Sequence, residues 1–191
     1  FNPYVAEWSP YHGAAYAVIE ATARLVAAGA NWSKARFSYQ EYFERMDKQA
    51  ERFGQPVAAL LGSIEAQIQL GLPSIGGKDS MSGTFEELTV PPTLVAFGVT
   101  TADSRKVLSP EFKTTGENIY YIPGQALSAD IDFDLIKKNF ETFEALQKAH
   151  KVTSASAVKY GGVVESLSLA TFGNHIGAEV ILPELETALT A

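Results

Sequence analysis

The sequence predicts a mixed α/β chain, because helical and strand-like segments alternate along its 191 residues. Apolar residues lie nearly all round residues 12–28, which predicts a buried helix. They recur at helical spacing over residues 133–151, which predicts an amphipathic helix, and residues 163–172 predict another helix. The continuous apolar run over residues 93–101 is long enough for one buried strand.

The segments between the first helix and this strand are less regular. Residues 35–39 predict a short strand or a turn, and residues 40–53 predict a polar helix. A second apolar helix is predicted after Gly54, ending at residues 71–73, where glycine and proline stop it. The glycine-rich residues 73–84 predict a loop between short strands.

A polar, mixed stretch over residues 102–116 predicts a domain boundary. We therefore expect one domain over residues 1–104 and a second over residues 105–191. Within the second domain, residues 118–122 and 178–182 predict strands.

Composition excludes several classes of protein. The net charge of −7 argues against a nucleic-acid-binding surface. The absence of cysteine excludes disulfides, thiol nucleophiles and cysteine-ligated zinc, and is compatible with a cytoplasmic protein. No apolar run is long enough to span a membrane. The first residues lack an initiator methionine and signal-peptide character, so we expect the chain to begin inside a longer one.

The strongest local signal for chemistry is a glycine-rich segment with a lysine, an aspartate and two serines. Glycines let backbone N–H groups turn toward an anion, lysine adds a charge, and serines donate to phosphate oxygens. Aspartate could hold Mg²⁺ through oxygen. An ordinary surface turn explains the same composition equally well. The candidate phosphate-binding residues are Gly76, Gly77, Lys78, Asp79, Ser80 and Ser82.

Two weaker signals lie elsewhere in the chain. Glu20 and Arg24 are one helical turn apart, which either supports the helix or places a charged pair in a cleft. Gly161 and Gly162 precede a helix, a weak anion-site pattern that equally describes a tight turn.

Four sets of residues, in order along the chain, resemble the large-form phosphoribosylformylglycinamidine synthases. Residues 72–82 resemble that family's Gly-Lys-Asp-Ser-(Met/Leu)-Ser segment, and residues 90–97 resemble the strand that follows it. Residues 9–14 and 42–45 resemble the clostridial-type variant. Residues 161–163 and 172–174 resemble the nucleotide-side loop and helix of the next domain.

The resemblance implies an aminoimidazole-ribonucleotide-synthetase-like unit of two domains, both incomplete in this chain, which would be an internal fragment of the second synthetase unit. It implies an ATP- and glutamine-dependent ligase that converts formylglycinamide ribonucleotide to formylglycinamidine ribonucleotide in purine biosynthesis. The expected partners are the first synthetase unit, the glutaminase domain and the ribonucleotide substrate. The isolated chain is expected to be inactive.

The resemblance also implies ATP or ADP and Mg²⁺ as cofactors of the parent enzyme. Glu20 matches a metal-binding glutamate, and Asp79 is a further candidate ligand. Arg24 stands where the family has asparagine, and residues 157–160 replace its Asp-Arg-Ser-Asp, with Lys159 in place of serine. These changes argue against the usual magnesium cluster and predict that Arg24, Lys159, Gly161 and Gly162 contact phosphate directly. The alternative is a vestigial pocket that a Glu20–Arg24 salt bridge closes.

Two alternatives remain open. The unit could be a non-catalytic scaffold half that binds phosphate or nucleotide without turnover. It could also belong to another ATP-using enzyme of the same superfamily, such as a selenophosphate synthetase or a thiamine-phosphate kinase.

Overall fold

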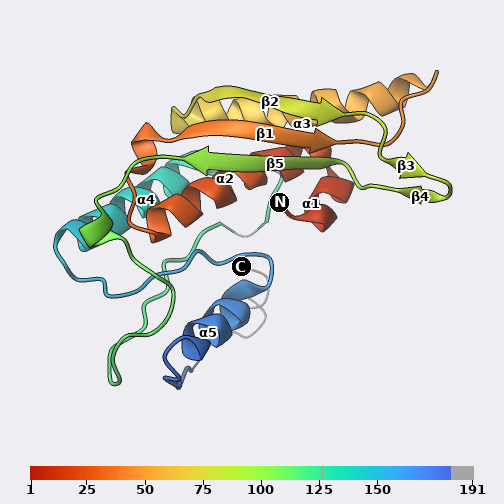
Figure 1. Cartoon of the computed structure of the whole chain (residues 1–191). Helices are drawn as coiled ribbons and strands as arrows, with labels where there is room; N and C mark the ends of the chain where they lie inside the picture. The colour runs from red at the N-terminus through yellow and green to blue at the C-terminus, as the bar shows by residue number, and fades with distance from the viewer. Residues whose placement is uncertain (126, 182–191) are drawn as a thin grey trace. The chain divides into compact units, whose positions relative to one another are not determined.

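The computed structural model describes residues 1–125 and 127–181, which fall into two compact units (Figure 1). The first unit comprises Phe1–Thr22 and Asn31–Thr101, and the second comprises Ala23–Ala30 and Ala102–Ala191. The mixed α/β class is confirmed. The domain boundary after residue 104 stays a prediction.

The helices of the first unit are α1 (Pro3–Trp8), α2 (Pro10–Ala27, with its last turn in the second unit) and α3 (Ala50–Leu70). The predicted buried helix is α2, in which Ala14, Ala15 and Val18 are almost fully enclosed.

Helix α3 ends where the sequence predicts. The residue after its last turn, Gly71, has a left-handed φ of 68°. The backbone N–H of Leu72 donates to the Gln67 carbonyl at 2.9 Å. Such a glycine satisfies carbonyls at the end of the helix that would otherwise be unpaired.

A three-stranded sheet covers these helices on one side (Figure 1). Its order is β2 (Ser74–Ser80), β1 (Arg36–Tyr42), β5 (Thr93–Val99), with β1 parallel to β2 and antiparallel to β5. Strand β5 confirms the strand that the apolar run over residues 93–101 predicts. A two-stranded hairpin, β3 (Thr84–Phe85) and β4 (Leu88–Thr89), projects from one end of the sheet (Figure 1).

Two predictions for this unit are wrong. The polar helix over residues 40–53 does not form as predicted, because residues up to Tyr42 belong to β1 and the next helix, α3, begins only at Ala50. The loop over residues 73–84 is wrong for residues 74–80, which form β2 by pairing with β1. In both places the pairing of non-local strands overrides the local composition.

The second unit contains α4 (Phe133–Lys148) and α5 (Gly162–Phe172), which confirm two predicted helices. Asp132 caps α4 by accepting from the Leu135 N–H at 2.9 Å. The Gln147 side chain donates to the Gly29 and Lys106 carbonyls at 3.0 and 3.1 Å, so α4 holds two distant segments of its unit together.

The predicted strands of the second unit are absent from its described part. Residues 118–122 are irregular, and so are residues 178–181, while Leu182 lies outside the described residues. A strand needs a neighbouring strand for its backbone groups, and no described residue of this unit supplies one. Within residues 1–125 and 127–181, no helix has both the length and the apolar character needed to cross a bilayer.

The crossing of α2 and α3 depends on a glycine. A Cβ atom at Gly62 would lie 1.9 Å from the Tyr11 carbonyl oxygen, so α3 approaches the α2 backbone more closely than any side chain allows. The buried face of α3 also carries the small residues Ala59, Ser63 and Ala66. The absence of a side chain at Gly62 therefore sets the distance between the helices at this contact.

We expect Gly62→Ala to destabilise the fold by about 1–3 kcal/mol, because the methyl group forces the helices apart. Gly54→Ala is the matched control in the same helix, since a Cβ atom there meets nothing within 4 Å. This control should be neutral or stabilising by up to about 1 kcal/mol through higher helix propensity. Urea unfolding followed by circular dichroism measures both, and equal stability of the two variants would contradict the close crossing.

Candidate functional site

The predicted phosphate segment lies on β2 and just beyond it. The strand register places Lys78 opposite Gln40 and Asp79 opposite Glu41 of β1. Because side chains alternate across a strand, Lys78 and Asp79 face opposite sides of the sheet. Lys78 therefore shares one face with Gly76 and Ser80, and Asp79 shares the other with Gly77.

The backbone of this segment requires glycine at both of its glycine positions. A Cβ atom at Gly77 would lie 2.5 Å from the Tyr39 carbonyl oxygen of β1, so only glycine allows this strand spacing. Gly76 has a φ of 144°, in the region that favours glycine, and it follows the irregular register between Phe37 and Ser38. A Cβ atom at Gly76 would meet nothing within 4 Å, so its neighbourhood is open to a ligand.

The segment continues past β2 along the end of β1. The Phe43 N–H donates to the Ser80 carbonyl at 2.9 Å, and the Gly83 N–H donates to the Phe43 carbonyl at 2.8 Å. The Ser80 and Ser82 hydroxyl oxygens are 3.5 Å apart. Backbone contacts therefore hold both serines close together, as joint donors to one anion would have to be.

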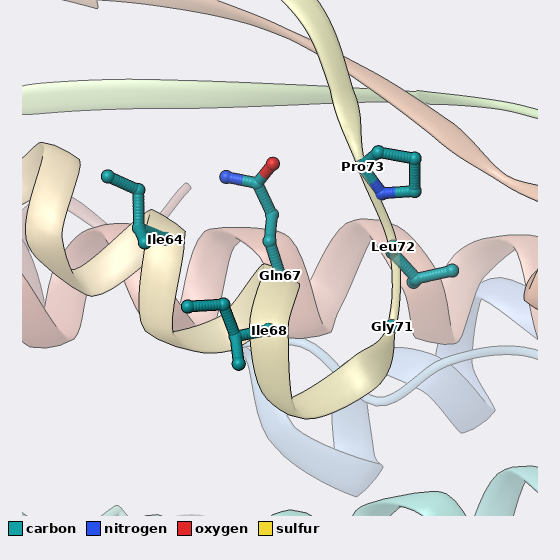
Figure 2. Close-up of a pocket in the computed structure, with 6 residues that line it drawn as sticks. All are labelled: Ile64, Gln67, Ile68, Gly71, Leu72 and Pro73. Carbon is teal, nitrogen blue, oxygen red and sulfur yellow. The ribbon is translucent and has the colours of Figure 1, made fainter.

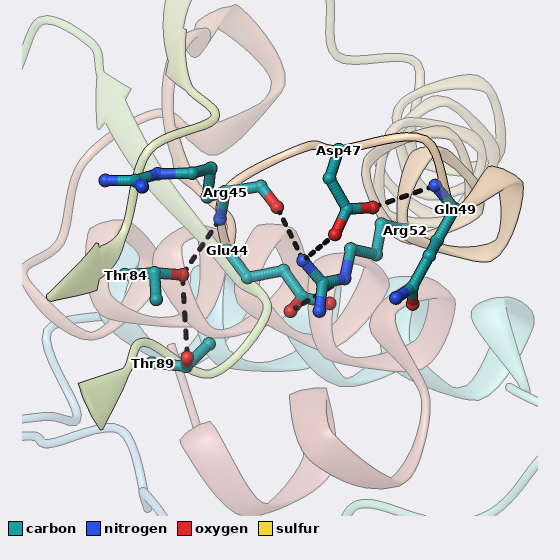
Figure 3. Close-up of polar contacts among 7 residues, drawn as sticks. All are labelled: Glu44, Arg45, Asp47, Gln49, Arg52, Thr84 and Thr89. Carbon is teal, nitrogen blue, oxygen red and sulfur yellow. Dashed lines mark hydrogen bonds and ion pairs between the residues drawn. The ribbon is translucent and has the colours of Figure 1, made fainter. Parts of the chain in front are cut away.

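An arginine fixes the connection between β1 and α3 (Figure 3). Arg52 forms ion pairs with Glu44 at 3.3 Å and Asp47 at 2.8 Å, and it donates to the Arg45 carbonyl at 3.0 Å. The Arg45 N–H in turn donates to the Thr84 hydroxyl at 3.0 Å. Arg52 thus ties the base of the β3–β4 hairpin to the start of α3.

A buried carboxyl group lies directly beside this segment. Glu41 is only 6% exposed, and its Oε1 has no hydrogen-bond partner among the described residues. It lies on the same face of β1 as Phe37 and Tyr39, opposite Asp79 of β2. The Tyr39 hydroxyl is likewise buried without a partner in the described part of the chain.

Both buried groups favour their neutral forms. Burial, and then the nearby Asp79 carboxylate, raises the pKa of Glu41 to about 7. Burial alone raises the pKa of Tyr39 above its ordinary value. Desolvation penalises a charge, and a second carboxylate adds repulsion. A carboxyl group that titrates near neutral pH can take up or release a proton there.

The sequence analysis missed Glu41 because it ended the possible strand at residue 39. A strand that continues through residue 42 puts Phe37, Tyr39 and Glu41 on one face. Extending the predicted strand that far would have placed the Glu41 carboxyl group on the buried side of the sheet. A carboxyl group on a buried face is uncommon without a partner.

The other predicted site residues are divided between the two units. Glu20, in the first unit, forms an ion pair with the N-terminal ammonium group of Phe1 at 3.1 Å. Arg24 lies in the segment of α2 that belongs to the second unit and is exposed. Glu20 and Arg24 nevertheless lie one turn apart on the same helix α2, as the sequence predicts, with the boundary between the units falling after Thr22.

Lys159, Gly161 and Gly162 form the turn that leads into α5. The Lys159 ammonium pairs with Glu165 at 3.0 Å, and the Gly162 N–H donates to the Lys159 carbonyl at 2.8 Å. A Cβ atom at Gly161 would lie 1.9 Å from Glu165 Oε2, and Gly162 has a φ of 71°. The two glycines thus have a role in the turn, and Lys159 already has a carboxylate partner.

These side chains do not form a magnesium site by themselves. Magnesium needs octahedral oxygen ligands. Among residues 1–125 and 127–181, no three histidine, aspartate or glutamate side chains lie close enough together to hold a metal ion. Glu20 and Asp79, the predicted ligands, belong to no such group.

We expect the carboxyl group of Glu41 to make stability depend on pH. Its pKa is about 7 in the folded chain, against an ordinary value of 4.5, so the folded state binds more protons between these values. The free energy of unfolding should therefore fall by about 2 kcal/mol as the pH rises from about 4.5 to 7.

Glu41→Gln should remove this decline, because glutamine stays neutral, and should be more stable than the wild type at pH 8. Urea denaturation at several pH values measures the difference. Glu87→Gln, an exposed position on the hairpin, is the control. A constant stability difference between Glu41→Gln and the wild type across this range would contradict the assignment.

Comparison with known proteins identifies the fold. No protein-family model matches the sequence. No curated protein matches it either. Solved structures of PurL from Thermotoga maritima do match.

Three of these structures cover almost the whole chain. The PurLQS structure has a TM-score of 0.69 at 18% identity, covering 97% of this chain and 29% of that one. PurL complexed with ATP has a TM-score of 0.66 at 16% identity, covering 97% and 32%. The structure of phosphoribosylformylglycinamidine synthase II has a TM-score of 0.64 at 19% identity, covering 94% and 28%. The chain thus spans about a third of the length of these proteins or slightly less, and shares their aminoimidazole-ribonucleotide-synthetase-like fold.

Proposed function

We propose that this chain is an internal part of the second synthetase unit of a clostridial-type phosphoribosylformylglycinamidine synthase. That enzyme would be the ATP- and glutamine-dependent ligase converting formylglycinamide ribonucleotide to formylglycinamidine ribonucleotide in purine biosynthesis. The observation that carries the proposal is that the fold matches PurL over 97% of the chain, while the sequence independently carries synthase-like motifs in order. The motif with the lysine, aspartate and serines lies on and just after β2.

The proposal makes this chain one part of a larger cytoplasmic enzyme. The chain has no cysteine, so it supplies no thiol nucleophile for glutamine hydrolysis, and ammonia would come from a glutaminase domain. The ligase reaction would use the first synthetase unit as well. ATP would activate the formamide oxygen of the substrate by phosphorylation, and ammonia would displace the phosphate.

Within this chain, the face of β2 that carries Lys78 and Ser80 is suited to phosphate oxygens. Lys78 is exposed and makes no ion pair within the described residues. Its ammonium group therefore keeps its charge available for an anionic ligand. The open surroundings of Gly76 and the paired hydroxyls of Ser80 and Ser82 add donors on the same stretch.

The turn before α5 supports a second role, nucleotide binding without turnover. Arg24 and Lys159 belong to the same compact unit, and two fixed cations can neutralise phosphate charge without a metal ion. The described residues include no group of three carboxylate or histidine side chains able to hold such an ion. Lys159 would exchange Glu165 for a phosphate oxygen on binding. A scaffold half that binds no nucleotide is favoured instead by that existing ion pair at 3.0 Å.

In the complete enzyme, we expect Lys78→Ala to raise the KM for the ribonucleotide or for ATP by about 10-fold or more, because a charge-assisted hydrogen bond is lost. ATP-dependent phosphate release with the formyl substrate and ammonia is the assay. Lys137→Ala, on the surface of α4 in an ion pair with Asp134, is the control. Unchanged kinetics for Lys78→Ala would show that β2 has only a structural role, and no ligase activity in the complete protein would refute the proposed reaction.

We expect ADP to bind this unit equally well with and without excess chelator. Arg24→Ala and Lys159→Ala should each weaken binding by about 10-fold or more, since each removes a cation from the phosphates. Isothermal titration calorimetry measures both effects, with Lys148→Ala on α4 as the control cation. Binding that requires Mg²⁺ would contradict the role of the two cations. No binding in either condition would favour the scaffold.

A further inference from the structure

Helix α3 carries a stripe of large apolar side chains on its outer face. All six members are between 42% and 69% exposed, so the described chain leaves most of this face uncovered. They recur every three or four residues and therefore lie on one side of the helix. This outer stripe consists of Phe53, Val57, Leu60, Leu61, Ile64 and Ile68.

The stripe cannot be explained as a misplaced core. The opposite face of α3 is already buried and needs small residues, because Gly62 lies against the Tyr11 carbonyl. Turning the helix to bury the stripe would push branched and aromatic side chains into the α2 backbone. A continuous apolar surface of this kind marks an interaction site.

The spacing of the stripe is the same read in either direction. Its midpoint lies between Leu60 and Leu61, and every member has a counterpart at an equal distance on the other side. The three pairs are Phe53 with Ile68, Val57 with Ile64, and Leu60 with Leu61. Two identical stripes packed antiparallel about a two-fold axis at this midpoint would therefore bring apolar side chains opposite apolar side chains along their whole length.

The C-terminal end of the stripe opens into a depression (Figure 2). Its volume is about 330 Å³. Its lining is almost entirely apolar and includes Ile64, Ile68, Leu72 and Pro73. In the antiparallel arrangement this end faces Phe53 of the second copy, whose ring is the largest side chain of the stripe. An aromatic anchor in an apolar pocket is typical of the centre of binding energy in an interface.

The edges of the stripe are compatible with the same arrangement. No charged residue belongs to the stripe, so no unpaired charge would be buried.

We propose that the outer stripe of α3 binds a second copy of this chain, with the two α3 helices antiparallel about a two-fold axis between Leu60 and Leu61. This inference does not depend on the proposed ligase function, because it uses only the exposure and spacing of α3.

The first test is the mass of the chain in solution, measured by sedimentation velocity over a range of concentrations. The wild type should form dimers in a concentration-dependent manner. Leu61→Glu should weaken dimerisation about 100-fold or more, because it brings two charges into an apolar contact. Leu88→Glu, on the hairpin at 75% exposure, should dimerise like the wild type. A wild type that stays monomeric at all concentrations, or equal dimerisation by Leu61→Glu, would overturn the proposal.

The second test uses the absence of cysteine from the chain and leaves the fold intact. Antiparallel pairing places residue 57 beside residue 64 of the second copy, so Val57→Cys/Ile64→Cys should form a covalent dimer on oxidation. Each single variant should not, because identical positions lie about 10 Å apart along the axis, beyond disulfide reach. Crosslinking of either single variant, or none in the double variant, would overturn the antiparallel arrangement.

Discussion

The approach of α3 to the Tyr11 carbonyl at Gly62 determines much of the first unit. Two helices that approach at backbone distance need a glycine at the contact, and Gly62 supplies it. The buried face of α3 also carries Ala59, Ser63, Ala66 and Leu70, while most of the larger apolar residues of this helix lie on its outer face. Helix α3 leads through Gly71 into β2, whose first residue Ser74 pairs with Phe37 near the start of the parallel strand β1.

The sequence predicts a helix or strand correctly where the apolar pattern of that segment alone determines it. Residues of α2 and α4 carry apolar patterns that match their burial, and Gly71 stops α3 as expected. The strand β5 forms as predicted, but Phe97 and Val99 are exposed, so the expectation that it is fully buried is wrong. The sequence prediction fails where a strand depends on a distant partner. Residues 74–80 have two glycines and four polar side chains, so only pairing with β1 explains a strand there. Residues 118–122 show the reverse, since their apolar composition favours a strand but no described neighbour pairs with them.

The candidate site shows the same division. Lys78, Asp79 and Ser80 could be chosen from the sequence because their residue types suit phosphate. The sequence did not indicate that Lys78 and Asp79 face opposite sides of the sheet, since a loop has no such alternation. Nor did it indicate that Asp79 lies opposite Glu41, and this proximity is one reason why the pKa of Glu41 reaches about 7. Gly77, Gly161 and Gly162 looked like ligand-binding glycines, yet each also meets a steric need of the chain itself.

Strand β2 lies at the edge of the described sheet, so the backbone groups on its outer side are open to another extended chain. Edges of this kind promote strand addition and aggregation unless their residues discourage it. The two glycines have low strand propensity, and the Lys78 ammonium would have to lose water if a new strand packed beside it. Ile75, at 78% exposure, is the one large apolar side chain on this strand and needs such protection most. The tendency of chains to associate through this sheet edge therefore depends on the same short strand that carries the candidate phosphate-binding residues. An apolar replacement of Lys78 would favour such association.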